Sequence, residues 1–247
     1  MQLLTFAPSH FSEKARWALD RTGLAYRERR LTPGLHRFLL RRAGAGNSVP
    51  ALILPGRVLK DSCSILQFAD EHLKPENRLY PEEPQLRQRV QEYEHRVGRE
   101  LGLSVPRWAY FYLLPRKDLM LQLFLPGVSR IQGALFRILF PLIRAVMRRG
   151  LGINGEAALR MQQRINAHFE EAGEILQAGG RYLFGDRFTA ADLSLAALAA
   201  PLLGVSRYGG TLIPIEQLPE EARHTVQNWR SHRLAAYVER IYRENRP

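Results

Sequence analysis

The stretch VPALILPGRVLKDSCSILQFADEHL, Val49 to Leu73, combines the pattern of a β-hairpin with that of a helix. The apolar runs ALIL and RVLK stand on either side of Pro55-Gly56, a dipeptide suited to the turn between two strands. From Ser62 onward, apolar residues recur at steps of three and four, which predicts a helix over 62–73. This part of the chain therefore predicts two paired strands followed by a helix.

Toward the N-terminus, strand and helix patterns alternate. LLTF at 3–6 is typical of a strand, and the amphipathic segment at 12–22 is typical of a helix. AYRERRL at 25–31 predicts a second strand, and a short helix is expected at 35–42. The resulting order, β-α-β-α-β-β-α, predicts an α/β fold in which helices pack on a small mixed sheet.

Toward the C-terminus, the pattern changes to helices alone. KPENRLYPEEP, Lys74 to Pro84, contains three prolines and few apolar residues, which is typical of a linker. Beyond it, apolar residues recur at helical steps at 86–101 and again around 156–178, 189–203 and 220–244. This second part is therefore predicted to be all-helical.

These patterns divide the chain into two domains. We expect an α/β domain over 1–76, a linker over 77–84 and an all-helical domain over 85–247. The segment at about 104–150 is longer than the helical domain needs, and it is both basic and apolar. We therefore treat this segment as an insert in the helical domain.

The composition is that of an ordinary globular protein, with 247 residues, 45% hydrophobic and 24% charged. The single cysteine, Cys63, excludes an internal disulfide and suits a reducing compartment. MQLLTF has neither the basic start nor the long apolar run of a signal peptide. No run of about 18 apolar residues predicts a membrane-spanning helix. We therefore expect a cytoplasmic protein.

The net charge of +12 is unusual, and it suits nucleic acid, an anionic membrane surface or anionic small molecules as partners. The charge is concentrated in residues 104–149, which contain eight basic side chains and one acidic side chain. No zinc-finger spacing, RNA-recognition motif or G-x-G-x-x-G accompanies it. We therefore expect no nucleic-acid partner.

The turn APSHFSEKARWAL, Ala7 to Leu19, leads from the first strand into the first helix. Ser12 is the expected N-cap, with Glu13 in the first turn, where the helix dipole favours an anion. Ser9 would then lie just before a helix N-terminus, where backbone N–H groups can bind an anion. On these residues alone, a capped turn that binds nothing is the favoured alternative.

Together, VPALIL, KDSCSILQFADEHL and the β-α-β start resemble the cytosolic glutathione transferase family in its Ser-type form. The resemblance covers residues 3–80 and 181–203 and is weak over 104–150. FTAADLSLAAL resembles the family's capping box, with Thr189 as N-cap and Asp192 as the third helical residue. The resemblance implies a thioredoxin-like N-terminal domain, a helical C-terminal domain, glutathione as co-substrate and no metal.

The resemblance also implies roles for particular residues. Ser9, counted back from RWAL, stands where the family activates the glutathione thiol. Val49-Pro50 matches a Val-cis-Pro pair whose backbone would bind the cysteinyl part of glutathione. Asp61-Ser62 matches the acidic-Ser pair that opens the third helix. There Ser62 would bind the γ-glutamyl carboxylate, and Asp61 would lie near the ammonium group.

Each of these matches has a plainer interpretation. A Val-Pro pair before a strand is common, and an Asp-Ser pair before a helix can be a simple cap. The lead-in to Val-Pro also departs from the family, because Asn47 stands in place of the expected glycine, which suits a left-handed conformation. The residue that binds the glycine end of glutathione is not identified; the candidates by location are His36, Arg37 and Arg41.

Several other residues near these motifs need an interpretation. Cys63 is expected to be a small buried residue, although it lies near a helix N-terminus that could lower the pKa of its thiol. His10 is expected to be a histidine of a surface turn, and the alternative is that it contacts substrate or polarises Ser9. Trp108 is expected to be a packing residue. Tyr110 and Tyr112 are candidate contacts for an electrophile bound between the two domains.

The insert contains a strongly amphipathic segment, 128–147. One face carries the apolar residues Val128, Ile131, Leu135, Ile138, Leu139, Leu142 and Val146. The opposite face carries Arg130, Arg137, Arg144 and Arg148. We expect a core helix with its apolar face buried and its basic face in solvent, kinked at Pro141. The alternative is a peripheral element that touches anionic lipid or a hydrophobic substrate.

Two functions from different classes follow. The first is a glutathione transferase that activates glutathione and adds it to a small hydrophobic electrophile; the resemblance implies that it is a homodimer. The second is a non-catalytic binding protein of the same fold that uses the basic amphipathic surface for an anionic or membrane partner. Ser9, Val49-Pro50 and Asp61-Ser62 favour the enzyme.

Overall fold

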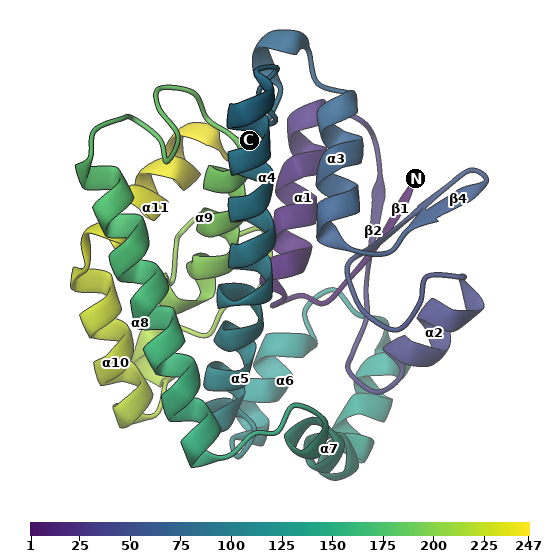
Figure 1. Ribbon diagram of the computed structural model, residues 1–247. Coiled ribbons are helices and arrows are strands. Elements are labelled where there is room, and N and C mark those ends of the chain that lie inside the picture. The colour runs from purple at the N-terminus through teal and green to yellow at the C-terminus, as the bar shows by residue number, and fades with distance from the viewer.

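The computed structural model describes residues 1–247, with a small sheet at one side and a bundle of helices at the other (Figure 1). The expected strand and helix order of the N-terminal part is confirmed. Its strands are β1 (Gln2–Thr5), β2 (Arg27–Arg30), β3 (Ala51–Leu54) and β4 (Arg57–Leu59). Its helices are α1 (His10–Thr22), α2 (His36–Arg42) and α3 (Ser62–Glu71).

The four strands form one mixed sheet in the order β2-β1-β3-β4. β1 runs parallel to β2 and antiparallel to β3, and β3 and β4 form the expected hairpin. Side chains alternate between the two faces of a strand. Leu3 and Leu52 accordingly pack with the α1 and α3 residues Leu19 and Ile65, whereas the next residue of β1, Leu4, packs with Leu40 of α2.

Helix α1 begins two residues earlier than the sequence pattern predicts. Its N-cap is Ser9, not Ser12, because the Ser9 Oγ accepts a hydrogen bond of 3.1 Å from the Ser12 N–H. Ser12 itself is buried. A serine three residues before another serine satisfies the same capping rule from either position, so the pattern could not choose between them. Glu13 lies in the first turn as expected.

The C-terminal part is all-helical, as the predicted fold class requires. Its helices are α4 (Pro84–Arg99), α5 (Leu101–Leu113), α6 (Lys117–Phe124), α7 (Arg130–Gly150), α8 (Gly155–Gln177), α9 (Ala190–Leu203), α10 (Glu220–Ser231) and α11 (Arg233–Asn245). Short 3₁₀ helices lie at Pro75–Asn77 and Ile215–Gln217. No helix combines the length and the hydropathy needed to cross a bilayer.

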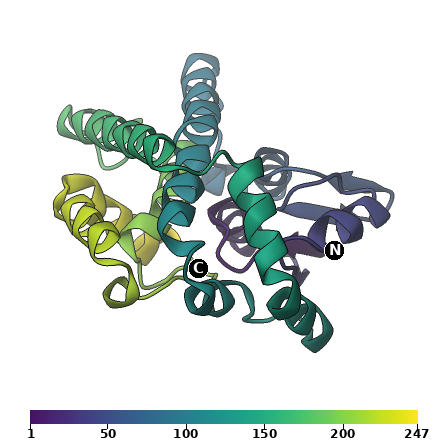
Figure 2. The same ribbon diagram turned by 90° about the horizontal axis from the view of Figure 1, so that it is seen from below.

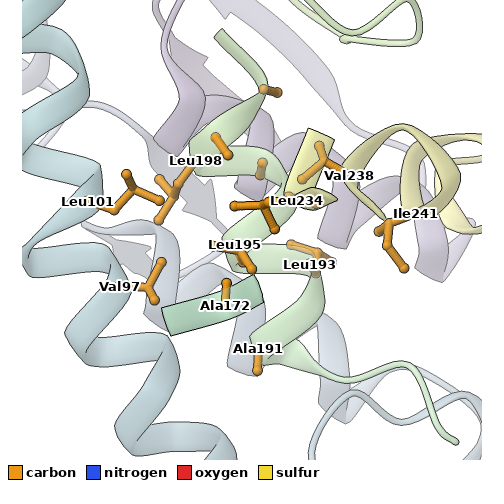
Figure 3. Packing of buried hydrophobic residues seen from close by; sticks show 14 of the residues in the cluster. Val97, Leu101, Ala172, Ala191, Leu193, Leu195, Leu198, Leu234, Val238 and Ile241 are labelled. Atoms are coloured by element: carbon orange, nitrogen blue, oxygen red, sulfur yellow. The ribbon is translucent and has the colours of Figure 1, made fainter. Parts of the chain in front are cut away.

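Helix α9 is the centre of the bundle, and 13 of its 14 residues are buried. Figure 3 shows its leucines surrounded by side chains from α4, α5, α8 and α11. The helix begins at the predicted capping box, in which the Thr189 N–H and hydroxyl both donate to Asp192 Oδ2. The other oxygen of Asp192 accepts from the Leu183 N–H and the Tyr237 hydroxyl. This folding element therefore also ties α11 to the start of α9.

Charged residues of α1 are buried where the two parts meet. Lys14 Nζ lies 2.7 Å from Glu94 Oε1 of α4, and both side chains are inaccessible to solvent. At the other side of α1, Arg246 lies 3.0 Å from Glu13 Oε1 and 2.7 Å from Asp20 Oδ2. Buried charges of this kind are tolerated only when paired, so these contacts hold α1 in one position against the bundle.

The interpretation of 128–147 is corrected by the structure. Helix α7 buries Phe136, Phe140 and Ile143 against α6, whereas the predicted core face, from Ile131 to Val146, is largely exposed. Apolar residues occupy more than half of the circumference of α7, so helical spacing alone identifies an arc too wide to be buried against one partner. The helix continues through Pro141 without interruption.

Candidate functional site

Two adjoining cavities open beside the N-terminus of α1. The Ser9 cavity, of about 270 Å³, lies between that N-terminus, α5 and the segment that joins α9 to α10. The Ser62 cavity, of about 620 Å³, lies between the start of α3 and the facing side of α4. Both are lined by Phe11, Ser48 and Val49, so one ligand can reach from one cavity into the other.

The structure brings the five predicted site residues to these two cavities. Ser9 and Val49 line the Ser9 cavity. Val49, Pro50, Asp61 and Ser62 line the Ser62 cavity. They come from three separate turns that the sheet brings together: the one after β1, the one before β3 and the one after β4.

The turn that carries Ser9 is held in place by one segment that is distant in the sequence. The Tyr208 hydroxyl donates to the Pro8 carbonyl at 2.9 Å, and the Thr211 N–H donates to the Ala7 carbonyl at 3.0 Å. Between them, a Cβ on Gly210 would come within 2.0 Å of the Ala7 carbonyl oxygen. Only glycine allows this approach of the two backbones. The turn that carries Ser9 is therefore set by the loop before α10.

The hydroxyl of Ser9 is only partly used by the protein. Its oxygen accepts from the Ser12 N–H, and its proton stays available as a donor. Ser9 is half-buried, at the positive end of a 13-residue helix. This arrangement suits an anionic atom placed beside the hydroxyl.

Asp61 and Ser62 open α3 as expected. Asp61 is the N-cap, and its two carboxylate oxygens accept from the N–H and the hydroxyl of Ser64, each at 2.8 Å. Ser62 is the first helical residue and is buried at the floor of its cavity. The plainer interpretation of Asp61 as a cap therefore holds, and it is compatible with a place at the cavity edge.

The Ser62 cavity also contains basic residues that the sequence patterns do not identify. Lys60 precedes the cap of α3, and Arg99 ends α4 on the facing side. Asp61 is the only carboxylate among the lining residues. An anionic ligand group would therefore meet a helix N-terminus and two cations here. Arg99 lies 37 residues from Ser62, and no local pattern could have paired them.

The turn before β3 agrees with the expectation in one respect and differs in another. The Val49-Pro50 peptide bond is cis, as the resemblance implies. Asn47, however, does not take the left-handed conformation, since only glycines in this chain have positive φ. Gly44 and Gly46 take it instead, with φ of 67° and 79°. Asn47 uses its side-chain oxygen to accept a 2.9 Å hydrogen bond from Arg41 Nε.

His10 is not a surface residue, and the expectation for it was wrong. Its Nε2–H donates to the Gly102 carbonyl of α5 at 2.8 Å, and the residue is only 5% exposed. Burial lowers the pKa of His10 from 6.5 to about 4. The ring is therefore neutral at pH 7 and links the start of α1 to the helical bundle, beside Ser9. A position next to a turn gave no sign of this distant partner.

The three candidates for the glycine end of glutathione are separated by the structure. His36 lines the Ser9 cavity, where its ring meets the edge of Phe6 at 4.9 Å between centroids. Burial, with Arg37 nearby, lowers the pKa of His36 to about 4. Arg37 does not line either of the two cavities, and Arg41 is committed to Asn47. His36 is therefore the best placed of the three.

Aromatic residues of α5 form the far wall of the Ser9 cavity. Tyr110 and Tyr112, the candidate electrophile contacts, both line it. Burial raises the pKa of the Tyr110 hydroxyl, so this group is neutral at physiological pH. Trp108 packs edge-on against Trp229, as a packing residue would, and also lines the cavity. Another part of the wall, from Leu212 to Leu218, belongs to the segment between α9 and α10, which has no recognisable motif.

Cys63 lines the Ser62 cavity beside the buried ion pair. Its Sγ lies 3.5 Å from Lys14 Nζ. Burial nevertheless raises the pKa of the thiol, and the Lys14 charge opposes this shift without reversing it. A thiol held protonated is a weak nucleophile, which agrees with a structural role, although Cys63 is half-buried and not buried as expected.

Comparisons with known proteins decide the family. The N-terminal domain model of glutathione S-transferases matches residues 3–77, and the C-terminal domain model matches residues 155–240. The chain belongs to the glutathione S-transferase family. A comparison with the curated proteins found no match. Residues 78–154 of this glutathione S-transferase, which include α4 to α7, lie outside both family models.

Solved structures share the fold at low sequence identity. A maleyl pyruvate isomerase, a bacterial zeta-class glutathione S-transferase, is 21% identical, with a TM-score of 0.60 over 98% of this chain and 91% of that chain. The β-etherase LigF from Sphingobium sp. strain SYK-6 is 21% identical, with a TM-score of 0.64 over 98% and 94%. A glutathione S-transferase from Methylobacterium radiotolerans, solved with glutathione sulfonate, is 19% identical, with a TM-score of 0.62 over 100% and 94%.

Proposed function

We propose that this protein binds glutathione across the two cavities, ionises its thiol beside Ser9 and transfers the sulfur to a hydrophobic electrophile. The observation that carries the proposal is the position of Ser9, a helix N-cap with a free hydroxyl proton, in an apolar cavity that adjoins the more polar Ser62 cavity. Membership of the family supports glutathione as the co-substrate.

Each part of glutathione has a matching environment. The γ-glutamyl carboxylate is held by the Ser62 hydroxyl and the N-terminus of α3, with Lys60 and Arg99 supplying positive charge. The backbone of Val49 pairs with the cysteinyl residue in the manner of an added strand. His36 is the best placed of the three candidates for the glycine end. With its two ends held in this way, glutathione places the thiol of its central cysteinyl residue beside Ser9.

The energy needed to ionise the thiol is within reach of these groups. A free thiol with a pKa of about 8.5 is only about 3% ionised at pH 7. Lowering that pKa by ~2 units requires ~2.7 kcal/mol of preferential interaction with the thiolate. A hydrogen bond to a charged group contributes ~1.5–3 kcal/mol, and a helix N-terminus up to ~1 kcal/mol. Ser9 and the start of α1 together meet this requirement.

The chemical step is attack by the thiolate on the electrophile in the Ser9 cavity. A carbon–sulfur bond forms, and the electron pair of the broken bond leaves with the leaving group or, in an addition, moves onto the electrophile and is protonated there. The Ser9 hydroxyl keeps its own proton throughout, because it acts as a hydrogen-bond donor. The aromatic wall from Trp108 to Tyr112 excludes water and holds apolar electrophiles. The family supports a cytoplasmic homodimer as the setting for this reaction.

The proposal is tested by titrating the ultraviolet absorbance of bound glutathione thiolate in the wild type, Ser9→Ala and Ser9→Thr. The wild type and Ser9→Thr, which keeps a hydroxyl, should show a thiol pKa well below that of free glutathione. Ser9→Ala should bind glutathione without this shift. Because Ser9 is also the N-cap, the alanine variant should lose about 1 kcal/mol of stability, which is measured separately. Absent binding, or an unshifted thiol in the wild type, refutes the proposal.

A further inference from the structure

A third cavity lies against the exposed apolar side of α7. This α7 cavity, of about 630 Å³, has Leu139, Leu142 and Val146 on one wall and residues 33–37, which lead into α2, on the other. Figure 2 views the molecule from below, where α7 passes beside the sheet part. The two walls are in close contact at one end, since a Cβ on Gly34 would lie 3.2 Å from the side chain of Ile143.

The α7 cavity is continuous with the Ser9 cavity. Five residues line both of them, namely Phe6, His36, Asn47, Pro106 and Tyr110. An extended molecule with its reactive end beside Ser9 could therefore pass along this shared border and continue onto α7. The Ser9 cavity alone, at about 270 Å³, is below the usual size of a small-molecule site, and the α7 cavity more than doubles the available volume.

The lining of the α7 cavity selects an apolar occupant. Eleven of its 18 lining residues are hydrophobic, and none is acidic. Leu142 and Val146 are 63% and 58% exposed, so the cavity is an open groove that would lose much of its exposed apolar area on filling. Exposed apolar groups on one side of a groove favour burial by a ligand that is itself apolar.

We propose that the α7 cavity binds the unreactive hydrocarbon chain of an elongated substrate, so that the preferred electrophiles are long-chain aliphatic molecules. This inference rests on the proposed function, because the reactive carbon must lie beside Ser9. Continuity with the Ser9 cavity favours a substrate chain over a lipid surface. A lipid surface would have to cover Ile131 and Ile138 as well, which are 75% and 73% exposed and do not line the cavity.

That difference supplies a matched pair of variants. Leu142→Asp places a charge in the α7 cavity, and Ile138→Asp places the same charge on the same helix outside it. Both native side chains are mostly exposed, so neither substitution removes a packed core residue. Both variants should therefore fold like the wild type.

The probes are S-alkylglutathiones of increasing length, from S-methyl through S-hexyl to S-tetradecyl, with dissociation constants measured by calorimetry on the full chain. These product analogues require no turnover. In the wild type and Ile138→Asp, affinity should rise by up to about fourfold per methylene and continue to rise beyond S-hexyl. In Leu142→Asp, the short ligands should bind as in the wild type, and the gain from the longer chains should be lost.

Three results would overturn the inference. If S-methylglutathione binds but longer chains add no affinity in the wild type, the α7 cavity holds no chain, although the proposed function survives. If no member of the series binds, the proposed function fails and this inference with it. If affinity is independent of chain length while both variants lose binding to phosphatidylserine vesicles equally, the exposed face of α7 is a lipid-binding surface.

Discussion

His10 should make the folded protein lose stability on mild acidification. Its buried ring has a pKa of about 4, whereas the same side chain in the unfolded chain has a pKa of 6.5. Between these values the unfolded chain takes up a proton that the folded protein does not. The stabilisation is therefore fully present above about pH 6.5 and is lost as the pH falls toward 4.

The magnitude follows from the two pKa values. Linkage gives a loss of about 2 kcal/mol between pH 7 and pH 5, and about 3 kcal/mol by pH 4. The hydrogen bond to the Gly102 carbonyl is not the source, since neutral and protonated imidazole can both donate it. The cost is that of charging a ring shielded from water. His36, with a pKa also lowered to about 4, adds a similar loss to the wild type.

Two substitutions isolate the contribution of His10. In His10→Gln the amide nitrogen can replace Nε2 as donor to Gly102, but it does not titrate. His10→Asn also removes the titrating group, and its shorter side chain does not reach the carbonyl. Urea denaturation at pH 7 and pH 5 should show both variants losing about 2 kcal/mol less than the wild type on acidification, with only the asparagine variant destabilised at pH 7. An unchanged pH dependence in the glutamine variant would refute the buried, neutral assignment.

Two further predictions concern the supports of the fold and of the site. Asp192→Ala should lower the free energy of unfolding, measured by urea denaturation, by at least about 3 kcal/mol, because it leaves the Leu183 and Thr189 N–H groups and the Tyr237 hydroxyl without their acceptor. Asp192→Asn keeps one acceptor and should lose less stability. A loss of under about 1 kcal/mol in the alanine variant would contradict this role of Asp192. Gly210→Ala should lower the free energy of unfolding by about 1–3 kcal/mol and weaken thiol ionisation beside Ser9, because the new Cβ would collide with the Ala7 carbonyl. The control Gly98→Ala, whose Cβ would meet no atom within 4 Å, should be neutral or slightly stabilising. Unchanged stability and an unchanged thiol pKa in Gly210→Ala would show that the turn does not depend on this contact.

The elements of the sheet part could be predicted because each has a local signal. The apolar run of β1, the Pro55-Gly56 turn and the cap at Asp61 depend on residues only a few positions apart. The capping box at Thr189 is local in the same way. Errors of one or two residues occurred at the ends, as at α1, where two serines satisfy the same rule.

The contacts that complete the candidate site are not local, and the sequence alone could not predict them. His10 is buried because α5 lies above it, Arg99 joins the Ser62 cavity from the end of α4, and Gly210 fixes the Ser9 turn from 201 residues away. Each depends on how the helical part packs on the sheet part. The periodicity of a single sequence does not indicate how its two parts pack on each other, so these contacts are known only from the folded structure.

Helix α7 is amphipathic, as its sequence pattern predicts, but the face that it buries differs from the predicted one. Its amphipathic character was evident from spacing, but the arc facing α6 is set by Phe136, Phe140 and Ile143, next to the arc that was expected to be buried. A helix with a single packing partner needs an apolar stripe of about a third of its circumference. The apolar arc of α7 is about twice that, so the excess itself implies a second contact. In this fold, one part of the excess arc, with Leu139, Leu142 and Val146, lines the cavity that is continuous with the Ser9 cavity, and a substrate chain would cover that part.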